Sequence, residues 1–436
     1  MTERRRGDPV KRHHLIRSLA TAAVGALVLA SCSGDGGGSD GGGGSDGGDV
    51  VLELVQSGDV NQGGGYATLT ERYFEETGVR VDVIEVPNDD LRTRLRTASQ
   101  ANDPPSLAAS PSTDPAWTDR LLDLTDIFNE VGIIDTLSVA DPADGLVKAL
   151  PTTLTAVGMF LNKSLWDEAG VDYPTTLDEA WTWDEYVELS DEVVEATDAE
   201  YGAVMDGSAH RLRAFLYEFG SEGVTEQPDG SWALDEAGAE ALEYFKQLHQ
   251  DGVMPQSVWG AADDPSATFK SGRVAGYMSG VWQIADFQET ITDFEWVSVP
   301  LPQQPVRATN YGAASWIVAF DGTGVEEETL DFIRWLYSEE NYREYCEISG
   351  CLPVLDGLEV SYEEDEYAFQ LYNAEILESP PISAVQTTDG VLHGYQGKSV
   401  DSEPLQDETV KFLNNEQSLE DTVENIGRIT TDQLAD

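Results

Sequence analysis

Alternating strand and helix patterns constrain the fold of this chain more than any other feature. VVLELVQ (residues 50–56) predicts a strand, and ATLTERYFEETG (67–78) predicts a helix that ends at its glycine. VRVDVIEV (79–86) alternates apolar and polar residues as strands do, DDLRTRLRTASQ (89–100) predicts a second helix, and SLAAS (106–110) predicts a short buried strand. Because strands that alternate with helices pack in layers, the sequence predicts an α/β fold.

The rest of the chain continues this alternation and then becomes mainly helical. GLVKALP and AVGMFLN (within 145–162) predict strands, and KSLWDEAG (163–170) predicts a helix that ends in glycine. Thr182 and Glu185 form a capping box that opens the helix WDEYVELSDEVVEA. Further helices are predicted at 209–219, 235–250, 264–271 and 281–289, with strands near 274–279, 294–299 and 314–319. The last third is predicted to be nearly all helix, and Ser418 caps the final one.

The segment before residue 50 carries location signals instead of a fold. Basic residues within positions 1–18 precede the short apolar stretch LATAAVGALVLA, which is typical of a secretory signal peptide and too short to span a membrane. Leu29-Ala30-Ser31-Cys32 resembles a bacterial lipobox, so residues 1–31 are expected to be removed and Cys32 to be lipidated. Residues 32–49 are then a flexible tether, because glycine, serine and aspartate bury nothing that offsets the entropy of ordering.

The charge of the chain excludes several classes of partner. The sequence has 81 Asp and Glu against 25 Lys and Arg, for a formal net charge of −56. Such a surface repels nucleic acid and anionic membranes, so contact with a membrane is expected only through the lipid on Cys32. A solvated acidic shell, as in proteins that work in salt, explains the excess of carboxylates.

Catalytic and metal-binding patterns are not expected in this chain. Once the signal peptide is removed, only His210, His249 and His393 remain, and no His/Cys spacing suits zinc. Formal matches to nucleophile-elbow, dinucleotide and phosphate-loop motifs lie in the wrong context or lack a required glycine. Adjacent carboxylates such as Asp263 and Asp264 are expected by chance in so acidic a chain. The sequence therefore predicts no enzyme, no metal site and no cofactor.

Several segments, in order, resemble a known family. They are RYFEETGVRVDVIEV, ALPTTLTAVGMFLNKSLWDEAGVDYP with TWDEYVELS, FKSGRVAGYMSGVWQIADF, YGAASWIVAF and EQSLEDTVENIGRI. Together they resemble the extracellular solute-binding proteins of ABC importers, in the sugar-binding family related to maltose-binding protein. The resemblance covers residues 50–436 and implies a two-lobed, periplasmic-binding-protein-like α/β fold of type II with ligand in the cleft.

The resemblance also implies where the lobes begin and end. The chain is expected to cross between them near 153–156, 298–302 and 318–321. Lobe one would hold residues 50–153 and 302–318, and lobe two would hold 156–297 and 321–436.

The candidate ligand-binding residues come from the resemblance and from the expected sheet edges. Trp282 follows a strand where the family places a stacking aromatic ring, Tyr311 and Trp316 flank the strand returning from the other lobe, and Thr155 lies at the first crossing. Carboxyl ends of strands face the ligand crevice in open α/β sheets. The polar candidates on the loops after the lobe-one strands are Ser57, Asp59, Asn88, Asp89, Ser110 and Asp114.

Two further groups have competing interpretations. His210 and Arg211 open a lobe-two helix in a region that faces the ligand in the family, and surface charge or helix packing is the alternative. If they face the cleft, an anionic ligand gains support. Tyr395 is the candidate to replace a cleft tryptophan that many relatives carry nearby.

The remaining cysteines are expected to be structural. Cys346 and Cys351 bracket EISG, and outside the cytoplasm a disulfide that stiffens this short loop is expected. Two reduced, buried thiols are the alternative. Cys32 is then the odd cysteine, and its lipidation accounts for it.

The sequence predicts a monomeric, membrane-tethered receptor on the outer face of the cell membrane. It is expected to capture a sugar or oligosaccharide and deliver it to the transmembrane permease of an ABC importer. Aromatic rings suit the apolar faces of sugars, and carboxylates and amides suit the hydroxyls. One alternative keeps the receptor role for glycerol 3-phosphate, a glycerophosphodiester or another small anion. The other alternative is a secreted carbohydrate-active hydrolase.

Overall fold

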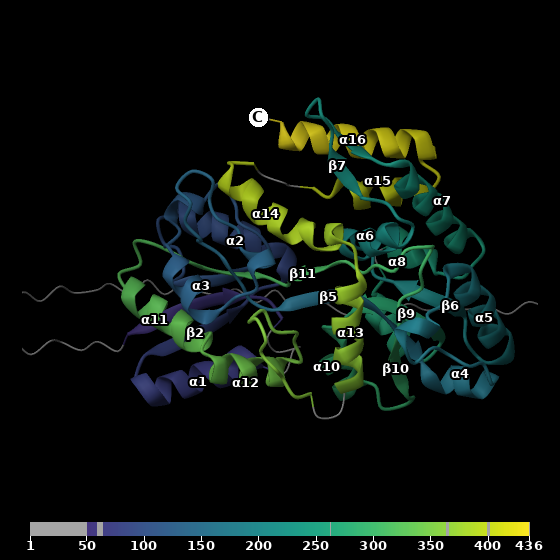
Figure 1. Ribbon diagram of the computed structural model, residues 1–436, viewed down its shortest axis with the longest axis horizontal. Coiled ribbons are helices and arrows are strands. Elements are labelled where there is room, and N and C mark those ends of the chain that lie inside the picture. Colours follow the sequence, from purple (N-terminus) through teal and green to yellow (C-terminus); the bar gives the residue numbers. More distant parts are fainter. Residues whose placement is uncertain (1–49, 59–63, 262, 363–365, 399–401, 436) are drawn as a thin grey trace, which may run out of the picture. The chain divides into compact units, whose positions relative to one another are not determined.

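The computed structural model of this chain describes residues 50–58, 64–261, 263–362, 366–398 and 402–435, all within one contact unit that spans residues 48–436 (Figure 1). The predicted signal peptide, Cys32, the tether and Asp59 lie outside the described residues, as does the side chain of Asp89. Within those ranges, no helix combines the length and the hydropathy that crossing a bilayer requires. The described chain contains two five-stranded sheets flanked by helices, so the predicted α/β class is confirmed.

The first sheet has the strand order β2-β1-β3-β12-β4. Its strands are β1 (Val51–Gln56), β2 (Arg80–Glu85), β3 (Leu107–Ser110), β4 (Leu150–Pro151) and β12 (Trp316–Ala319). β1 runs parallel to β2 and β3, and Leu54 pairs with Val83 on one side and Leu107 on the other. β12 runs antiparallel to β3. The parallel strands therefore present their carboxyl ends at one edge, which is the edge where ligands bind in open α/β sheets.

Helices cover both faces of the first sheet. They are α1 (Gly65–Thr77), α2 (Asn88–Gln100), α3 (Thr125–Val131), α11 (Glu326–Leu336), α12 (Glu339–Ser349) and α14 (Val385–Tyr395). Leu54 packs in one core with α1, α11 and α12, where the rings of Tyr73 and Phe332 lie 5.0 Å apart. Val55 packs in a separate core with α2 and α14. As predicted, α1 ends at Gly78, whose left-handed backbone lets its N–H donate to Phe74 O.

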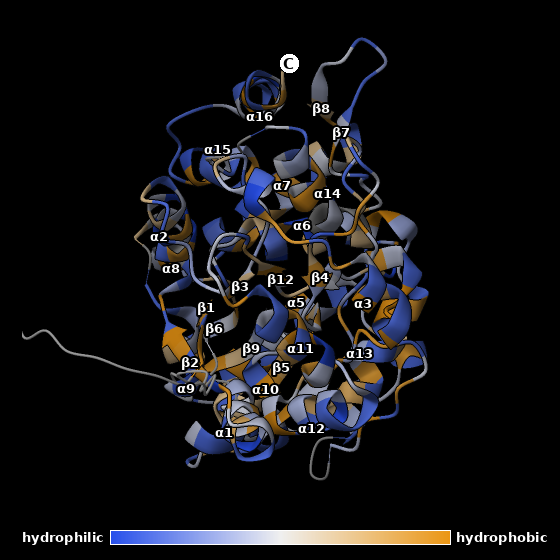
Figure 2. Cartoon of the chain, turned by 90° about the vertical axis from the view of Figure 1, so that its left-hand side faces the viewer, coloured by the Kyte–Doolittle hydropathy of each residue, from blue (hydrophilic) through white to orange (hydrophobic). Residues whose placement is uncertain are grey.

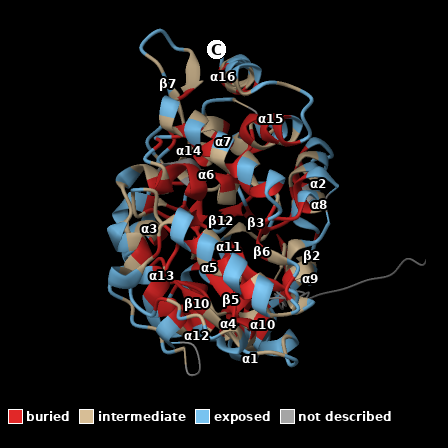
Figure 3. Ribbon diagram, turned by 90° about the vertical axis from the view of Figure 1, so that its right-hand side faces the viewer, coloured by how far each residue is buried: buried red, intermediate tan, exposed pale blue. Residues whose placement is uncertain are grey.

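The second sheet has the order β10-β5-β9-β6, and β11 pairs with the first part of β5. Its strands are β5 (Leu154–Asn162), β6 (Tyr201–Met205), β9 (Val274–Gly280), β10 (Trp296–Val299) and β11 (Tyr311–Ala313), and a separate hairpin joins β7 (Val224–Glu226) to β8 (Trp232–Leu234). Every residue of β9 is buried. Figure 3 shows the buried strands in red and exposed helix surfaces in pale blue.

The remaining helices complete the fold. They are α4 (Lys163–Ala169), α5 (Trp183–Ala196), α6 (Ala209–Glu218), α7 (Glu236–Gln250), α8 (Gln256–Gly260), α9 (Pro265–Lys270), α10 (Gln283–Thr290), α13 (Glu366–Glu378), α15 (Pro404–Leu413) and α16 (Leu419–Leu434), with the 3-10 helices η2 (Thr118–Arg120), η3 (Asp135–Leu137), η4 (Leu177–Glu179) and η5 (Pro381–Ala384). The capping boxes predicted at Thr182 and Ser418 are both formed, so the sequence signals for these helix starts are confirmed. Figure 2 shows hydrophobic residues in strands such as β2, and many hydrophilic residues on outer helices such as α12.

Two of the expected crossing points need correction. The first crossing falls at residues 152–153, between β4 and β5, next to the predicted position. The second is not at 298–302, because β11 still pairs with β5; it falls at residues 314–315, before β12 enters the first sheet. The third is not at 318–321, because the apolar faces of α11 and α12 fill a core of the first sheet. Residues 302–313 therefore belong to lobe two instead of lobe one, and α11 and α12 belong to lobe one instead of lobe two.

The two short crossing segments lie side by side. Thr152 donates its backbone N–H to Ser315 O at 2.8 Å, and Ala314 donates its N–H to Thr153 O at 2.8 Å. The hydroxyls of Thr152 and Ser315 also lie 2.8 Å apart. Residues 152–153 and 314–315 thus form a hydrogen-bonded connecting ribbon between the two sheets.

The expected disulfide between Cys346 and Cys351 is not formed, and both residues are free and buried. They lie at the end of α12, where Cys351 donates its backbone N–H to Cys346 O at 3.2 Å. Burial raises the pKa of the Cys351 thiol well above its usual range. Disulfide formation starts from a thiolate, so burial protects the reduced pair.

Buried carboxylates lie beneath the segment that follows β10. Glu218 is fully buried and accepts a hydrogen bond from Trp183 Nε1 at 2.6 Å. Glu375 accepts one from the Leu301 N–H at 2.9 Å and lies 3.6 Å from the Arg307 guanidinium. Burial raises the pKa of Glu375 to about 7, against the lowering effect of Arg307. Between about pH 4.5 and pH 7, the folded protein therefore holds a proton on Glu375 that the unfolded chain releases.

Because of this proton, the free energy of unfolding decreases as the pH rises. Because the folded pKa of Glu375 lies above its ordinary 4.5, its contribution is fully present below about pH 4.5 and is lost as the pH rises to about 7. We expect Glu375→Gln to remove this loss, so that its stability exceeds that of the wild type by up to about 3 kcal/mol at pH 8. Urea unfolding from pH 5 to pH 8 measures the effect, with the exposed Glu366→Gln on the same helix as the control. If the free energies of unfolding of Glu375→Gln and the wild type change with pH in the same way, the raised pKa does not belong to Glu375.

Candidate functional site

Trp282 occupies the place where β9 ends and α10 begins. It is the N-cap residue of α10 and is half-buried. A Cβ at Gly280 would lie 2.1 Å from an atom of the indole ring, so only glycine lets the ring fold back over the end of β9. The chain thus places a large aromatic ring at the carboxyl end of a central strand, partly open to solvent.

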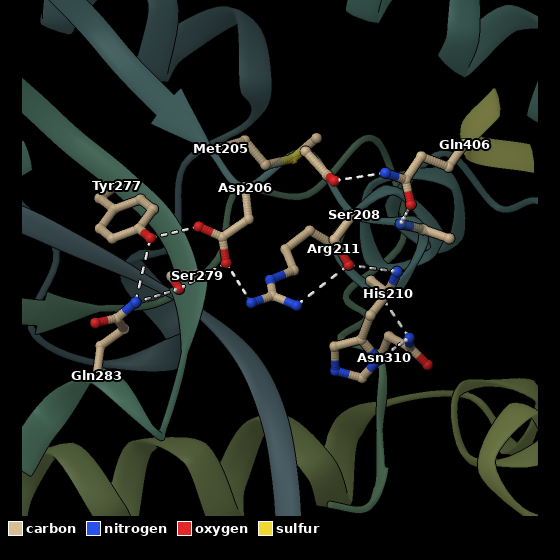
Figure 4. A network of polar contacts seen from close by, with 12 residues as sticks. Met205, Asp206, Ser208, His210, Arg211, Tyr277, Ser279, Gln283, Asn310 and Gln406 are labelled. Atoms are coloured by element: carbon tan, nitrogen blue, oxygen red, sulfur yellow. Dashed lines mark hydrogen bonds and ion pairs between the residues drawn. The ribbon is translucent and has the colours of Figure 1, made fainter. Parts of the chain in front are cut away.

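Arg211 supports this ring from the neighbouring helix. Its guanidinium carbon lies 4.2 Å from the centroid of the Trp282 ring, which is cation–π distance. Arg211 also forms an ion pair with Asp206 and donates from Nη1 to the Ser208 hydroxyl at 3.2 Å (Figure 4). The positive charge of Arg211 is therefore neutralised inside the protein, and the side chain acts as a support for the indole.

Asp206 is the centre of the polar network in Figure 4. It follows β6 directly and accepts hydrogen bonds from the Tyr277 hydroxyl and, at 3.0 Å, from the Ser279 hydroxyl, both on β9. Gln283 Nε2 donates to the same two hydroxyls, at 3.2 Å and 3.3 Å. Burial and the charge of Asp206 raise the pKa of Tyr277, which keeps its hydroxyl protonated as a donor. The network fixes the ends of β6 and β9 together beneath Trp282.

His210 is held between the α6 N-terminus and β11. Asn310 Nδ2 lies 2.7 Å from His210 Nδ1 and donates to the His210 carbonyl at 2.9 Å. The His210 and Trp282 rings have centroids 6.0 Å apart. Ser208 caps α6 through the His210 N–H, and Gln406 of α15 accepts from the Ala209 N–H at 3.2 Å. Two elements far apart in the sequence thus fix the start of α6.

A cavity of about 320 Å³ lies farther along α6. Its lining combines the loop after β3 with residues of α6, β8 and the C-terminal helices, and includes Asp114, Arg213, Tyr217, Trp232, Asp389 and His393. The first sheet and the C-terminal region meet beside it, because the Thr113 hydroxyl donates to Val391 O at 2.7 Å. A Cβ at Gly394 would lie 2.2 Å from Thr113 Oγ1, so glycine allows α14 to approach this loop.

The structure brings some of the predicted residues together. Trp282, His210 and Arg211 form one cluster, and Tyr311 directly follows Asn310, which binds His210. Thr155 is on β5 and pairs with Gly312 of β11. Asp114 lines the cavity, although its carboxylate is paired with Arg96 at 2.7 Å.

Of the other predicted residues, three are occupied by packing and two stay predictions. Trp316 is fully buried in a core of the first sheet, and Ser110 is buried with its hydroxyl donating to Ser112 O at 2.7 Å. Tyr395 packs partly buried against the same core as Trp316. Ser57 directly follows β1, and Asn88 is exposed at the start of α2. Trp316, Ser110 and Tyr395 are therefore occupied by packing, whereas ligand contact by Ser57 and Asn88 stays a prediction.

Sequence reasoning missed most of the cavity. Arg213 and Tyr217 lie three and seven residues after His210, so helical spacing could have placed them on the same face. Trp232 follows the Asp229-Gly230 turn of a hairpin, and that turn is a recognisable signal. No local signal brings Asp389 and His393 to these residues, because they come from α14, far along the chain.

Comparison with known proteins gives consistent findings. The family of bacterial extracellular solute-binding proteins matches residues 68–370. An arabinooligosaccharide-binding protein of Halalkalibacterium halodurans is 26% identical over 210 residues, which are 46% of this chain and 46% of that protein. A binding protein of Brucella abortus is 23% identical over 362 residues, covering 75% of this chain and 82% of its own length.

Solved structures show the same fold. The GacH receptor of Streptomyces glaucescens, solved unliganded and with acarbose, matches with a TM-score of 0.71 and 18% identity, over 89% of this chain and 99% of its own. The cyclic α-maltosyl-1,6-maltose-binding protein of Arthrobacter globiformis matches with a TM-score of 0.63 and 22% identity, again over 89% and 99%. The two-sheet architecture is therefore that of a two-lobed solute-binding protein.

Proposed function

The chain belongs to the bacterial extracellular solute-binding proteins, and from that premise we propose that it captures a sugar or oligosaccharide between its two sheets. The bound sugar is then delivered to the transmembrane permease of an ABC importer. The receptor is a monomer, exported by its signal peptide and held at the outer face of the membrane by a lipid on Cys32.

The half-buried Trp282 ring is the observation that carries this proposal. An indole face suits the apolar C–H face of a sugar ring, and the ring is fixed in place by Gly280 and Arg211. The nearby cavity adds tryptophan, tyrosine, carboxylate and guanidinium groups, which together suit a ligand that has both C–H faces and hydroxyls. Similar proteins named for binding oligosaccharides support the same class of ligand.

The geometry argues against an anionic ligand at Trp282. His210 and Arg211 do lie beside that ring, as the anionic alternative required. Asp206, however, already neutralises Arg211, and Asn310 holds His210. A phosphate at this position would meet an ion pair and not a free cation.

A thermal-shift screen tests the proposal. Ligand that binds only the folded state raises the melting temperature, with a stabilisation of about 2.7 kcal/mol at one hundred times Kd. We expect a panel of mono- and oligosaccharides to contain at least one that raises Tm, whereas glycerol 3-phosphate and glycerophosphodiesters leave it unchanged. Chromatography of the incubated sugar should return it intact. A shift only with the phosphorylated ligands, or cleavage of a glycoside, would contradict the proposal.

A further inference from the structure

Helix α14 belongs to one lobe by its position in the chain and to the other lobe by its packing. The helices before and after it, α13 and α15, pack into the core of the second sheet through residues such as Phe369 and Phe412. Val391 of α14 is instead fully buried in a core of the first sheet, and Leu392 and Tyr395 pack partly buried against the same core. In Figure 1, α14 extends from above α2 to the upper end of α13. The helix therefore joins the two lobes at a place separate from the connecting ribbon.

The contact between α14 and lobe one is close. The Thr113 hydroxyl, on the loop after β3, donates to Val391 O at 2.7 Å, and this hydrogen bond is buried. Gly394 faces the same loop, because an added Cβ would lie 2.2 Å from Thr113 Oγ1 and 2.7 Å from the Thr113 carbonyl carbon. Backbone atoms cannot move aside as the end of a long side chain can. Glycine at position 394 is therefore a condition for α14 to pack against this loop.

The opposite side of α14 faces lobe two. An α-helix turns about 100° per residue, so the side chains of Asp389 and Val391 point about 200° apart. Asp389 lines the cavity together with Arg213 of α6, and the His393 ring lies edge-on to Trp232 of β8 with centroids 6.4 Å apart. Asp389 and His393 are only partly buried. The helix thus presents a buried apolar side to lobe one and a polar side to lobe two.

The start of α14 is fixed to the second sheet. The 3-10 helix η5 leads directly into α14, and both contact β11, which pairs with β5. Just before η5, the Ser379 hydroxyl accepts from the Thr309 N–H at 2.8 Å, and the Thr309 hydroxyl donates to Val157 O of β5 at 2.8 Å. Pro380 and Pro381 stiffen this connection, because their rings fix φ. Along residues 379–385, the chain therefore holds α14 to lobe two without a flexible spacer.

We propose that α14 is a latch that holds the two lobes together before a ligand binds. Lobes that rotate apart about the connecting ribbon carry the anchored start of α14 away from the first sheet. Val391 then has to leave its core, and its hydrogen bond with Thr113 has to break. Exposure of a buried valine and loss of a buried hydrogen bond both oppose this motion. The ligand-free protein is therefore more closed than the ribbon alone would keep it, whatever the class of its ligand.

Two alanine substitutions on α14 test the latch in the ligand-free protein. Both replace a helical glycine, so both favour the helix itself to a similar extent. Gly394→Ala places a Cβ against the Thr113 backbone, so we expect α14 to leave lobe one and the radius of gyration from small-angle X-ray scattering to increase. Hydrogen exchange of the α14 amides should become about 10- to 100-fold faster, as loss of a buried valine contact implies. Gly390→Ala is the matched control, because its Cβ would lie at an ordinary 3.4 Å from Ser112 Cβ and should change neither quantity.

The outcomes separate the latch from the proposed function. If Gly394→Ala has a wild-type melting transition but also the wild-type radius and exchange rates, or if Gly390→Ala opens the protein equally, the latch is wrong. Thr113→Val removes only the hydroxyl bonded to Val391 O and should change both quantities in the same direction by less. It decides the question if Gly394→Ala folds poorly, and no change in either quantity would then overturn the latch. Sugar binding by a protein without a latch leaves the proposed function intact, and a latch in a protein that binds no sugar leaves only the latch.

Discussion

Replacing Asp206 with alanine is expected to lower the free energy of unfolding by about 3–5 kcal/mol, because it leaves a buried charge without its partner. The Asp206 and Arg211 side chains are only 11% and 17% exposed. The substitution also removes the acceptor of the Tyr277 and Ser279 hydroxyls. The substitution therefore removes three contacts of the network at once.

Urea unfolding of three variants measures this effect and its origin. Asp263→Ala removes an exposed carboxylate and should change stability by less than about 0.5 kcal/mol. Arg211→Met combined with Asp206→Ala removes the orphaned charge, so the double variant should be more stable than Asp206→Ala alone. A loss below about 1 kcal/mol for Asp206→Ala, or a double variant that is less stable than it, would show that the ion pair does not hold this region together.

Replacing Trp282 with alanine is expected to raise the Kd for the sugar about 10- to 100-fold. The loss of a large apolar contact face costs about 1.5–3 kcal/mol, and each 1.4 kcal/mol is a factor of ten. Trp282→Phe keeps a ring above Arg211 and should recover most of the affinity. Titration calorimetry with the sugar found by thermal shift gives the values. Unchanged affinity for Trp282→Ala, in a variant with wild-type Tm, would remove Trp282 from the site.

Much of the fold was predictable because its signals are local. The helix stop at Gly78 and the capping boxes at Thr182 and Ser418 depend on a few neighbouring residues, and all three are confirmed. The crossings were not predictable in this way. Tyr311 and Trp316 are five residues apart, yet their strands belong to different sheets, and that choice depends on partners far along the chain.

The candidate site shows the same division. Trp282 and the pair His210 and Arg211 were predicted, and the structure brings them together. The ion pair between Arg211 and Asp206 was not predicted. It requires the Asp206 carboxylate, at the end of β6, to point toward α6. Trp316 was predicted at the cleft because it flanks the strand that returns from the other lobe, but it is fully buried in a core of the first sheet. The cavity combines segments from five parts of the chain, which no local pattern relates.

The connecting ribbon has a mechanical consequence. Two peptide segments joined by hydrogen bonds, 152–153 and 314–315, resist twisting and sliding against each other more than they resist bending as a pair. We expect the lobes to move relative to each other mainly by a hinge rotation about one axis. A ligand that bridges the lobes then has little relative motion to suppress, so most of its contact energy remains available for affinity.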